Sequence, residues 1–316
     1  MKTRKAAFIF LFPLLFLGAC NRGDVKHEPY DDTPTTGEIT ILADESYQPL
    51  IQVQIDTFME LYKYAKINVR YLPESEIFNQ LMTNDTIRLA ITGRELTSDE
   101  KLYFESRKII PRSLKIAEDA IALIVNPANT DTNITVEQLS GIIRGKISTW
   151  NQVSGGKLKD SIRVVYDRNG SANARYLKEK FLDTGNLPAN SYATSSNAAV
   201  VDYVSNTPGA IGVIGVNWIS DRDDPASNAF LKKIRVVGLA QKDSLGNQTD
   251  YFQPFQAYIA LKNYPLTREV MIISREGRNG LGTGFASFVA GDKGQRMIRM
   301  MGLLPATMPV RIIQVN

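Results

Sequence analysis

The sequence predicts an α/β fold of mostly parallel sheets flanked by helices, and two observations carry that prediction. Short runs rich in β-branched residues alternate with runs whose apolar residues recur at helical spacing. Residues 119–126 form a continuous apolar run of the kind found in buried strands. The chain has 316 residues, which suggests two domains, or one large one, at roughly 100–200 residues per domain.

The predicted elements alternate from Glu38 onward. Pro49 suits the first turn of the first helix, because the N–H that proline lacks would be unpaired there anyway. Such alternation is typical of βαβ units. Strands are expected at 39–42, 67–71, 87–91, 119–126, 162–166 and 210–216, and helices at 49–64, 77–82, 135–143, 172–182, 197–205 and 285–289.

Two residue types are nearly missing, and this excludes several kinds of enzyme. The chain has one cysteine, Cys20, and one histidine, His27. A disulfide within the chain, a Cys/His zinc site, a Ser-His-Asp triad and a cysteine protease site are therefore excluded. Carboxylate chemistry, Ser-Lys chemistry or binding alone remains. We predict a binding protein with no catalytic residue, no metal and no cofactor.

Residues 1–19 are predicted to be a lipoprotein signal peptide. Three cations precede an apolar core at 6–17 that is short for a membrane-spanning helix. The core ends in Leu-Gly-Ala-Cys20, which resembles the bacterial lipobox, whose cysteine receives the diacylglyceryl group. A plain signal peptide or an anchor helix is the alternative. We expect a protein of the cell envelope, lipid-anchored at Cys20, periplasmic or associated with the outer membrane.

Removal of this signal changes the charge. Lys and Arg number 37 against 33 Asp and Glu. Loss of Lys2, Arg4 and Lys5 leaves 37 − 3 = 34 cations and a net charge of +1, which does not favour nucleic acid as a partner. Residues 20–37 are polar and are expected to form a tether that contains His27 as a solvated residue.

Hydroxyl residues recur where predicted strands end. In three places a serine follows a strand and begins a helix, and a fourth strand ends in Thr92-Gly93-Arg94. Helix N-termini offer unpaired N–H groups and a positive dipole end, so several together make an anion site. Arg94 or Arg168 would add charge and two-pronged hydrogen bonding. Taken singly, each serine is more often only a helix cap. The serines are Ser46, Ser75 and Ser171.

Several longer segments occur in an order that is typical of one family. They are DAIALIVNP at 119–127, ITVEQLSGIIRGKISTWN at 134–151, NAAVVDYV at 197–204 with PGAIG at 208–212, YPLTR at 264–268, and Gly294-Gln295 with GLLP at 302–305. With these segments the chain, from about Glu38 to Pro309, resembles the substrate-binding proteins of bacterial phosphate ABC transporters, which are class II periplasmic binding proteins.

The resemblance implies a two-lobed fold that closes like a hinge on its ligand. Lobe 1 would comprise residues 38–120 plus 263–316, and lobe 2 residues 121–262. The ligand would be an inorganic oxyanion, with phosphate preferred, and the partners would be the permease subunits of an ABC importer, with the binding protein a monomer. The alternative is an oxyanion sensor or non-transport binding module for sulfate, molybdate or tungstate. No constellation of residues supports an enzyme.

The resemblance also implies ligand-binding residues. Ser46 matches the hydroxyl of the first loop and Ser75 the serine of the second. Residues 170–173 fall on the glycine-serine-glycine-threonine anion loop; Ser171 is retained, Ala172 replaces glycine and Asn173 replaces threonine. The implied ligand-binding set is Ser46, Ser75, Thr92, Arg94, Arg168, Ser171, Ala172 and Asn173.

Two family positions are changed. The arginine that precedes the anion loop falls on Asp167, next to Arg168, and the aspartate that accepts the proton of phosphate falls on Gly93. A buried carboxylate acceptor rejects sulfate, because sulfate has no proton to donate. Asp167 or Glu95 is therefore the candidate replacement, and phosphate selectivity depends on it.

Overall fold

The structure is a computed structural model that describes residues 32–154, 158–182, 186–243 and 245–309. The predicted signal peptide, Cys20 and His27 lie outside these ranges. No helix within them is long and apolar enough to cross a membrane.

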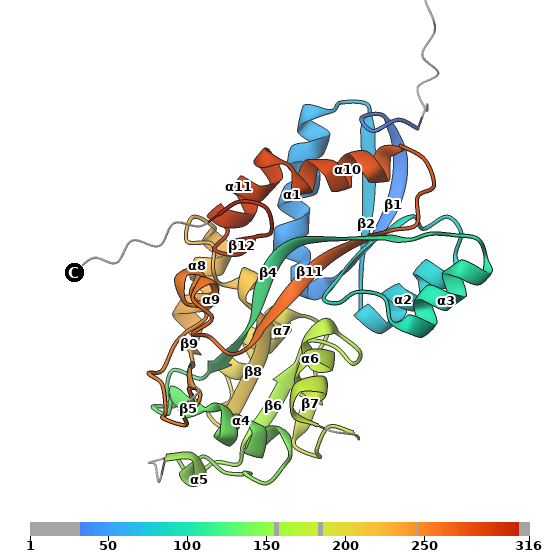
Figure 1. Cartoon of the computed structure of the whole chain (residues 1–316). Coiled ribbons are helices and arrows are strands. Elements are labelled where there is room, and N and C mark those ends of the chain that lie inside the picture. Colours follow the sequence, from blue (N-terminus) through green and yellow to red (C-terminus); the bar gives the residue numbers. More distant parts are fainter. Residues whose placement is uncertain (1–31, 155–157, 183–185, 244, 310–316) are drawn as a thin grey trace, which may run out of the picture.

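A single curved sheet forms the centre of the described chain, in the order β2-β1-β3-β11-β4-β8-β6-β7, with β9 and β12 paired to β4 (Figure 1). A separate pair joins β5 and β10. The strands are β1 (Gly37–Asp44), β2 (Ala65–Leu72), β3 (Leu89–Thr92), β4 (Arg112–Val125), β5 (Asn133–Thr135), β6 (Arg163–Tyr166), β7 (Ser191–Ala193), β8 (Ala210–Gly215), β9 (Arg235–Val236), β10 (Gly238–Ala240), β11 (Thr267–Ser274) and β12 (Leu304–Pro305).

The prediction of an α/β fold with sheets flanked by helices is confirmed, and the sheet is mixed. Parallel pairs lie toward its two edges, where β1 joins β2 and β3, and β6 joins β7 and β8. In the middle, β11 is antiparallel to β3 and β4, and β4 is antiparallel to β8. These antiparallel pairs differ from the expected parallel pattern because β4 and β11 carry the chain between the two ends of the sheet.

The long strand β4 divides the sheet into two halves. Residues 112–120 pair with β11, whereas residues 121–125 pair with β8. We call β1, β2, β3, β11 and residues 112–120, with their helices, the first half. The second half comprises β6, β7, β8 and residues 121–125, with their helices. The apolar run predicted at 119–126 is therefore the end of a longer strand that crosses from one half to the other.

Helices cover both halves (Figure 1). The predicted helices are all present, with ends that shift by a few residues, and several more occur. The first half carries α1 (Gln48–Leu61), α2 (Glu74–Thr83), α3 (Ser98–Ser106), α10 (Leu281–Ala290), α11 (Asp292–Met300) and the 3-10 turn η1 (Glu45–Tyr47). The second half carries α4 (Val136–Ile143), α5 (Asn151–Ser154), α6 (Ala172–Phe181), α7 (Asn197–Ser205), η2 (Val216–Trp218), α8 (Pro225–Lys233) and α9 (Gln256–Ala260).

One glycine allows α7 to pack closely on the sheet. A Cβ atom at Gly212 in β8 would lie 2.7 Å from methyl carbons of Val200 and Val204 on α7, and 2.8 Å from Ile124 of β4. Real Cβ atoms do not make contacts this short, so the helix is seated on the sheet at a place where no side chain fits.

We predict that Gly212→Ala lowers the free energy of unfolding by about 1–3 kcal/mol, the usual effect of overpacking a core. Gly277→Ala is the matched control, because a Cβ there would meet nothing within 4 Å; its effect should stay within about 0.5 kcal/mol. Urea unfolding followed by circular dichroism measures both. Equal stability of the two variants would contradict the packing argument.

Candidate functional site

The loops that follow β1 and β6 meet between the two halves, and a buried carboxylate lies at their meeting point. Asp167, which follows β6, is fully buried. It accepts hydrogen bonds from Ser46 Oγ at 3.1 Å, Ser171 Oγ at 2.5 Å, Asn173 Nδ2 at 3.1 Å and Asn197 Nδ2 at 3.2 Å. Ser46 belongs to the first half and the other donors to the second. Four neutral donors from both halves thus surround one acidic group.

Two further carboxylates reach from the first half to helix N-termini of the second. Asp44, at the end of β1, accepts from the main-chain N–H of Ala172 at 3.0 Å, in the first turn of α6, and from that of Ser46 at 2.9 Å. Glu45 accepts from Asn197 at the start of α7, from the main-chain N–H at 3.2 Å and from Nδ2 at 2.6 Å. Both contacts place negative charge where helix dipoles favour it.

An ion pair makes a third connection between the halves. Glu74, at the start of α2, is 1% exposed and pairs with Arg175 of α6. The Glu74 carboxylate also accepts from the main-chain N–H of Gly93 at 2.6 Å, and Arg175 Nη2 donates to the carbonyl of Gly93 at 3.2 Å. The end of β3 is thereby tied to both α2 and α6.

We call Asp44, Glu45, Glu74 and Asp167, with the donors that bind them, the acidic cluster. A buried arginine lies close to this cluster. Arg268 of β11 donates through Nε and Nη2 to Asp119 of β4, at 3.0 and 2.7 Å. Its guanidinium carbon lies 4.7 Å from the ring centroid of Tyr47. Arg268 Nη1 and the Tyr47 hydroxyl are buried and have no hydrogen-bond partner within the described chain. They are therefore donors that remain available at the edge of the cluster.

Burial makes these acids harder to ionise. Burial, and after it the charges of Asp167 and Glu74, raises the pKa of Asp44 to about 7. Burial raises the pKa of Glu45 to about 7, although the hydrogen bonds from Asn197 oppose the shift. Burial also raises the pKa of Asp167, against the hydrogen bond from Ser171. The groups that face one another here are the acids Asp44, Glu45, Glu74, Asp119 and Asp167, the cations Arg175 and Arg268, and the Tyr47 hydroxyl.

The structure brings four of the eight sequence-predicted residues into the cluster. Ser46, Ser171 and Asn173 donate to Asp167, and the main-chain N–H of Ala172 donates to Asp44. Of the two candidate acceptors, Asp167 is buried in the cluster, whereas Glu95 is exposed.

The other four lie outside the cluster. Ser75 and Arg94 line a neighbouring cavity of about 650 Å³ together with Glu74 and Arg175. The Arg94 guanidinium is bound by Glu100 at 2.7 and 2.8 Å and stacks on the Phe78 ring at 3.6 Å. Thr92 Oγ1 donates to the Arg94 carbonyl, and Arg168 Nε donates to the Ser195 carbonyl. Instead of Arg94 and Arg168, the arginines near the buried acids are Arg175 and Arg268.

Sequence reasoning passed over Asp44, Glu45, Glu74, Asn197 and Arg268. One signal was present for Arg268. Asp119 opens a strongly apolar run, and a carboxylate in such a strand needs a cation. The contacts of the other residues join positions 101 to 152 residues apart, and no local pattern marks them.

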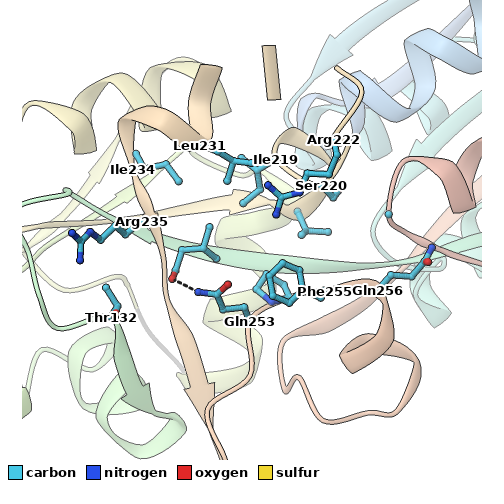
Figure 2. A pocket seen from close by; sticks show the side chains of 14 residues that line it. Thr132, Ile219, Ser220, Arg222, Leu231, Ile234, Arg235, Gln253, Phe255 and Gln256 are labelled. Atoms are coloured by element: carbon cyan, nitrogen blue, oxygen red, sulfur yellow. Dashed lines mark hydrogen bonds between the residues drawn. The ribbon is translucent and has the colours of Figure 1, made fainter. Parts of the chain in front are cut away.

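A second cavity, of about 590 Å³, lies among η2, α8, β9 and residues 253–256 (Figure 2). Three of its polar side chains bind main-chain carbonyls: Gln253 donates to Val236 at 2.9 Å, Ser220 to Met301 at 2.5 Å and Gln256 to Leu303 at 2.5 Å. Apolar side chains form much of its wall, including Ile219, Leu231 and Ile234. This cavity shares no lining residue with the acidic cluster and lacks the set of converging donors found there.

The raised pKa values predict that stability falls as pH rises. An acid whose pKa is higher in the folded chain destabilises the fold once the unfolded chain can ionise, from about pH 4, and the loss levels off near the folded pKa of about 7. For Glu45 the shift from 4.5 to about 7 corresponds to about 3 kcal/mol. Other carboxylates also titrate, so the comparison is between the wild-type protein and Glu45→Gln.

Urea unfolding between pH 4 and 8 measures this effect. The wild-type protein should lose more stability between pH 4.5 and 7 than Glu45→Gln does. Glu60→Gln, on the exposed surface of α1, should follow the wild-type curve. Parallel curves of stability against pH for the wild-type protein and Glu45→Gln would contradict the raised pKa of Glu45.

Comparison with known proteins finds proteins named as phosphate-binding that are similar to this chain over most of its length. It is 22% identical to the phosphate-binding protein PstS of Bacillus subtilis, over 97% of this chain and 96% of that protein. It is 24% identical to PstS of Staphylococcus aureus strain USA300, over 89% and 81%. A proposed phosphate ABC transporter substrate-binding protein from Clostridium perfringens, solved with bound phosphate, has a TM-score of 0.70 at 20% identity, over 86% of this chain and 100% of that one.

An ABC-type phosphate transport receptor from Vibrio cholerae has a TM-score of 0.63 at 21% identity, over 85% of this chain and 100% of that one. At these identities the structural likeness establishes the fold. The family match covers most of the sequence, since the PBP superfamily domain matches residues 28–293. The chain therefore belongs to the PBP superfamily.

Proposed function

We propose that this protein captures phosphate between the two halves of its sheet, outside the cytoplasm, and delivers it to an ABC importer. The observation that carries the proposal is the set of four donors from both halves that converge at Asp167. Hydroxyl and amide donors of this kind, with helix N-termini beside them, are the groups that replace the water around a buried oxyanion. The relatives named as phosphate-binding proteins support the same ligand.

The acids in the cluster favour phosphate over sulfate. At neutral pH phosphate keeps at least one proton and can donate it to a carboxylate, whereas sulfate has none to donate. Asp167 is the best-placed acceptor, because it is buried and already collects the donors that the ligand would use. A sulfate ion facing this carboxylate would leave two unpaired acceptors in contact, which is costly away from water.

The two halves act as lobes in this proposal, with the division at residues 38–120 plus 263–316 and 121–262. Support comes from β4, whose pairing partner changes from β11 to β8 between residues 120 and 121. A hinge at this point would let the lobes open to admit the ligand and close around it.

The place in the cell and the partners rest on the sequence. The lipobox-like end at Cys20 and the polar tether after it support a lipid-anchored protein of the cell envelope. The permease subunits of the importer would bind the closed monomer.

Phosphate should bind and raise the melting temperature, because a ligand that binds only the folded state stabilises it. Sulfate at the same concentration should bind at least 100-fold more weakly. Calorimetric titration of the purified protein, dialysed free of phosphate, measures both affinities. Absence of any heat or melting shift with phosphate would overturn the proposal, and equal binding of sulfate would overturn the role of the acids.

Ser46→Ala should weaken phosphate binding by about tenfold, since it removes one buried donor worth about 1 kcal/mol or slightly more. Ser287→Ala is the matched control, because Ser287 is exposed on α10. Its affinity for phosphate should equal that of the wild-type protein. Unchanged affinity in Ser46→Ala would place the ligand elsewhere.

A further inference from the structure

Three acids of the first half bind donors of the second half directly. Asp44 accepts from the main-chain N–H of Ala172, and Glu45 accepts from the main-chain N–H and side-chain amide of Asn197. Glu74 pairs with Arg175. Each of these contacts crosses between the halves, and each donor belongs to α6 or α7.

Two of these acids hold donors that an oxyanion would need. The N–H groups at the start of α6 and α7 are the helix-terminal groups on which anions bind. A carboxylate and a phosphate are acceptors of the same kind, so they compete for one N–H. The Asp44 and Glu45 carboxylates already satisfy Ala172 and Asn197, as a bound oxyanion would.

The charges in this region also oppose an incoming anion. Five buried acids face two arginines, and both arginines are already paired, Arg175 with Glu74 and Arg268 with Asp119. Additional negative charge in such a place is costly unless an acid leaves or takes up a proton. The acids of the first half therefore oppose the binding of an anion at this place.

We propose that Asp44, Glu45 and Glu74 form a built-in latch, which holds the two halves together by occupying donors of the second half and which phosphate displaces when it binds. The displacement step rests on the proposed function, whereas the closure of the halves by the latch does not. Two hydrogen bonds between uncharged groups also connect the two halves. The carbonyl of Ser46 accepts from Asn217 Nδ2 at 2.7 Å and from Trp218 Nε1 at 3.1 Å.

Glu45→Gln tests the displacement. Among the described residues, the second-half groups that donate hydrogen bonds to Glu45 all belong to Asn197, and glutamine has nearly the same shape as glutamate without the charge. The variant should bind phosphate at least tenfold more tightly than the wild-type protein, because the ligand then displaces a weaker acceptor and meets one negative charge fewer. Glu60→Gln, which removes one exposed negative charge from α1 of the same half, should leave the affinity unchanged. Calorimetric titration measures all three proteins.

The direction of the change separates the possible roles of Glu45. Weaker binding in Glu45→Gln would overturn the latch and make Glu45 a group that receives the ligand. Unchanged affinity would also overturn it, because a carboxylate that does not compete with phosphate is no latch.

Small-angle X-ray scattering tests the closure without phosphate. The wild-type protein should be as compact without phosphate as with it. The double variant Glu45→Gln/Glu74→Gln should be expanded without phosphate and should become compact when phosphate is added. A wild-type protein that is expanded without phosphate and contracts on its addition would overturn the latch.

The titration and the scattering experiment together distinguish a failure of the proposed phosphate function from a failure of the latch. If no variant binds phosphate, but the wild-type protein is compact and the double variant is expanded, the proposed phosphate function fails and the closure by the latch is supported. If phosphate binds and Glu45→Gln does not bind it more tightly, the phosphate function stands and the latch fails.

Discussion

Burial of acids between the two halves of the sheet is the constraint on which the rest of this structure depends. A carboxylate removed from water must find donors or a cation, and a helix N-terminus must find acceptors. Here the carboxylates and the helix N-termini satisfy one another, because Asp44 and Glu45 accept hydrogen bonds from the first turns of α6 and α7. Asp167 accepts hydrogen bonds from neutral donors of both halves. The cluster is therefore a structural connection between the halves and the proposed binding site.

The geometry of the sheet makes this meeting possible. β4 crosses from one half to the other. The pairings through β3, β11, β4 and β8 make β1 and β6 run in opposite directions, and Ser46 after β1 meets Asp167 after β6 between the halves. The same strand carries Asp119, whose pairing with Arg268 of β11 keeps a guanidinium near the acids. A single strand thus supplies the connection between the halves, the proposed hinge and the anchor for the nearest buried cation.

The site differs in charge from what its motifs suggest. The serines, the N-termini of α6 and α7, and the amide of Asn173 are donors suited to an oxyanion, yet the acids around them outnumber the arginines. A ligand that brings its own proton reconciles the two features, because it can donate to Asp167 while it accepts from the serines. This is the physical reason why the proposed site favours phosphate over sulfate.

The sequence by itself determined the elements and the local part of the site. Strand and helix periods, and a serine at a helix start such as Ser46 or Ser171, depend on neighbours a few residues away. Only the tertiary structure decided which charges meet. Glu74 binds an arginine 101 residues away, and Glu45 binds an amide 152 residues away. Pairing over such distances depends on how the whole sheet folds, whereas Arg94 binds Glu100 only six residues along the chain.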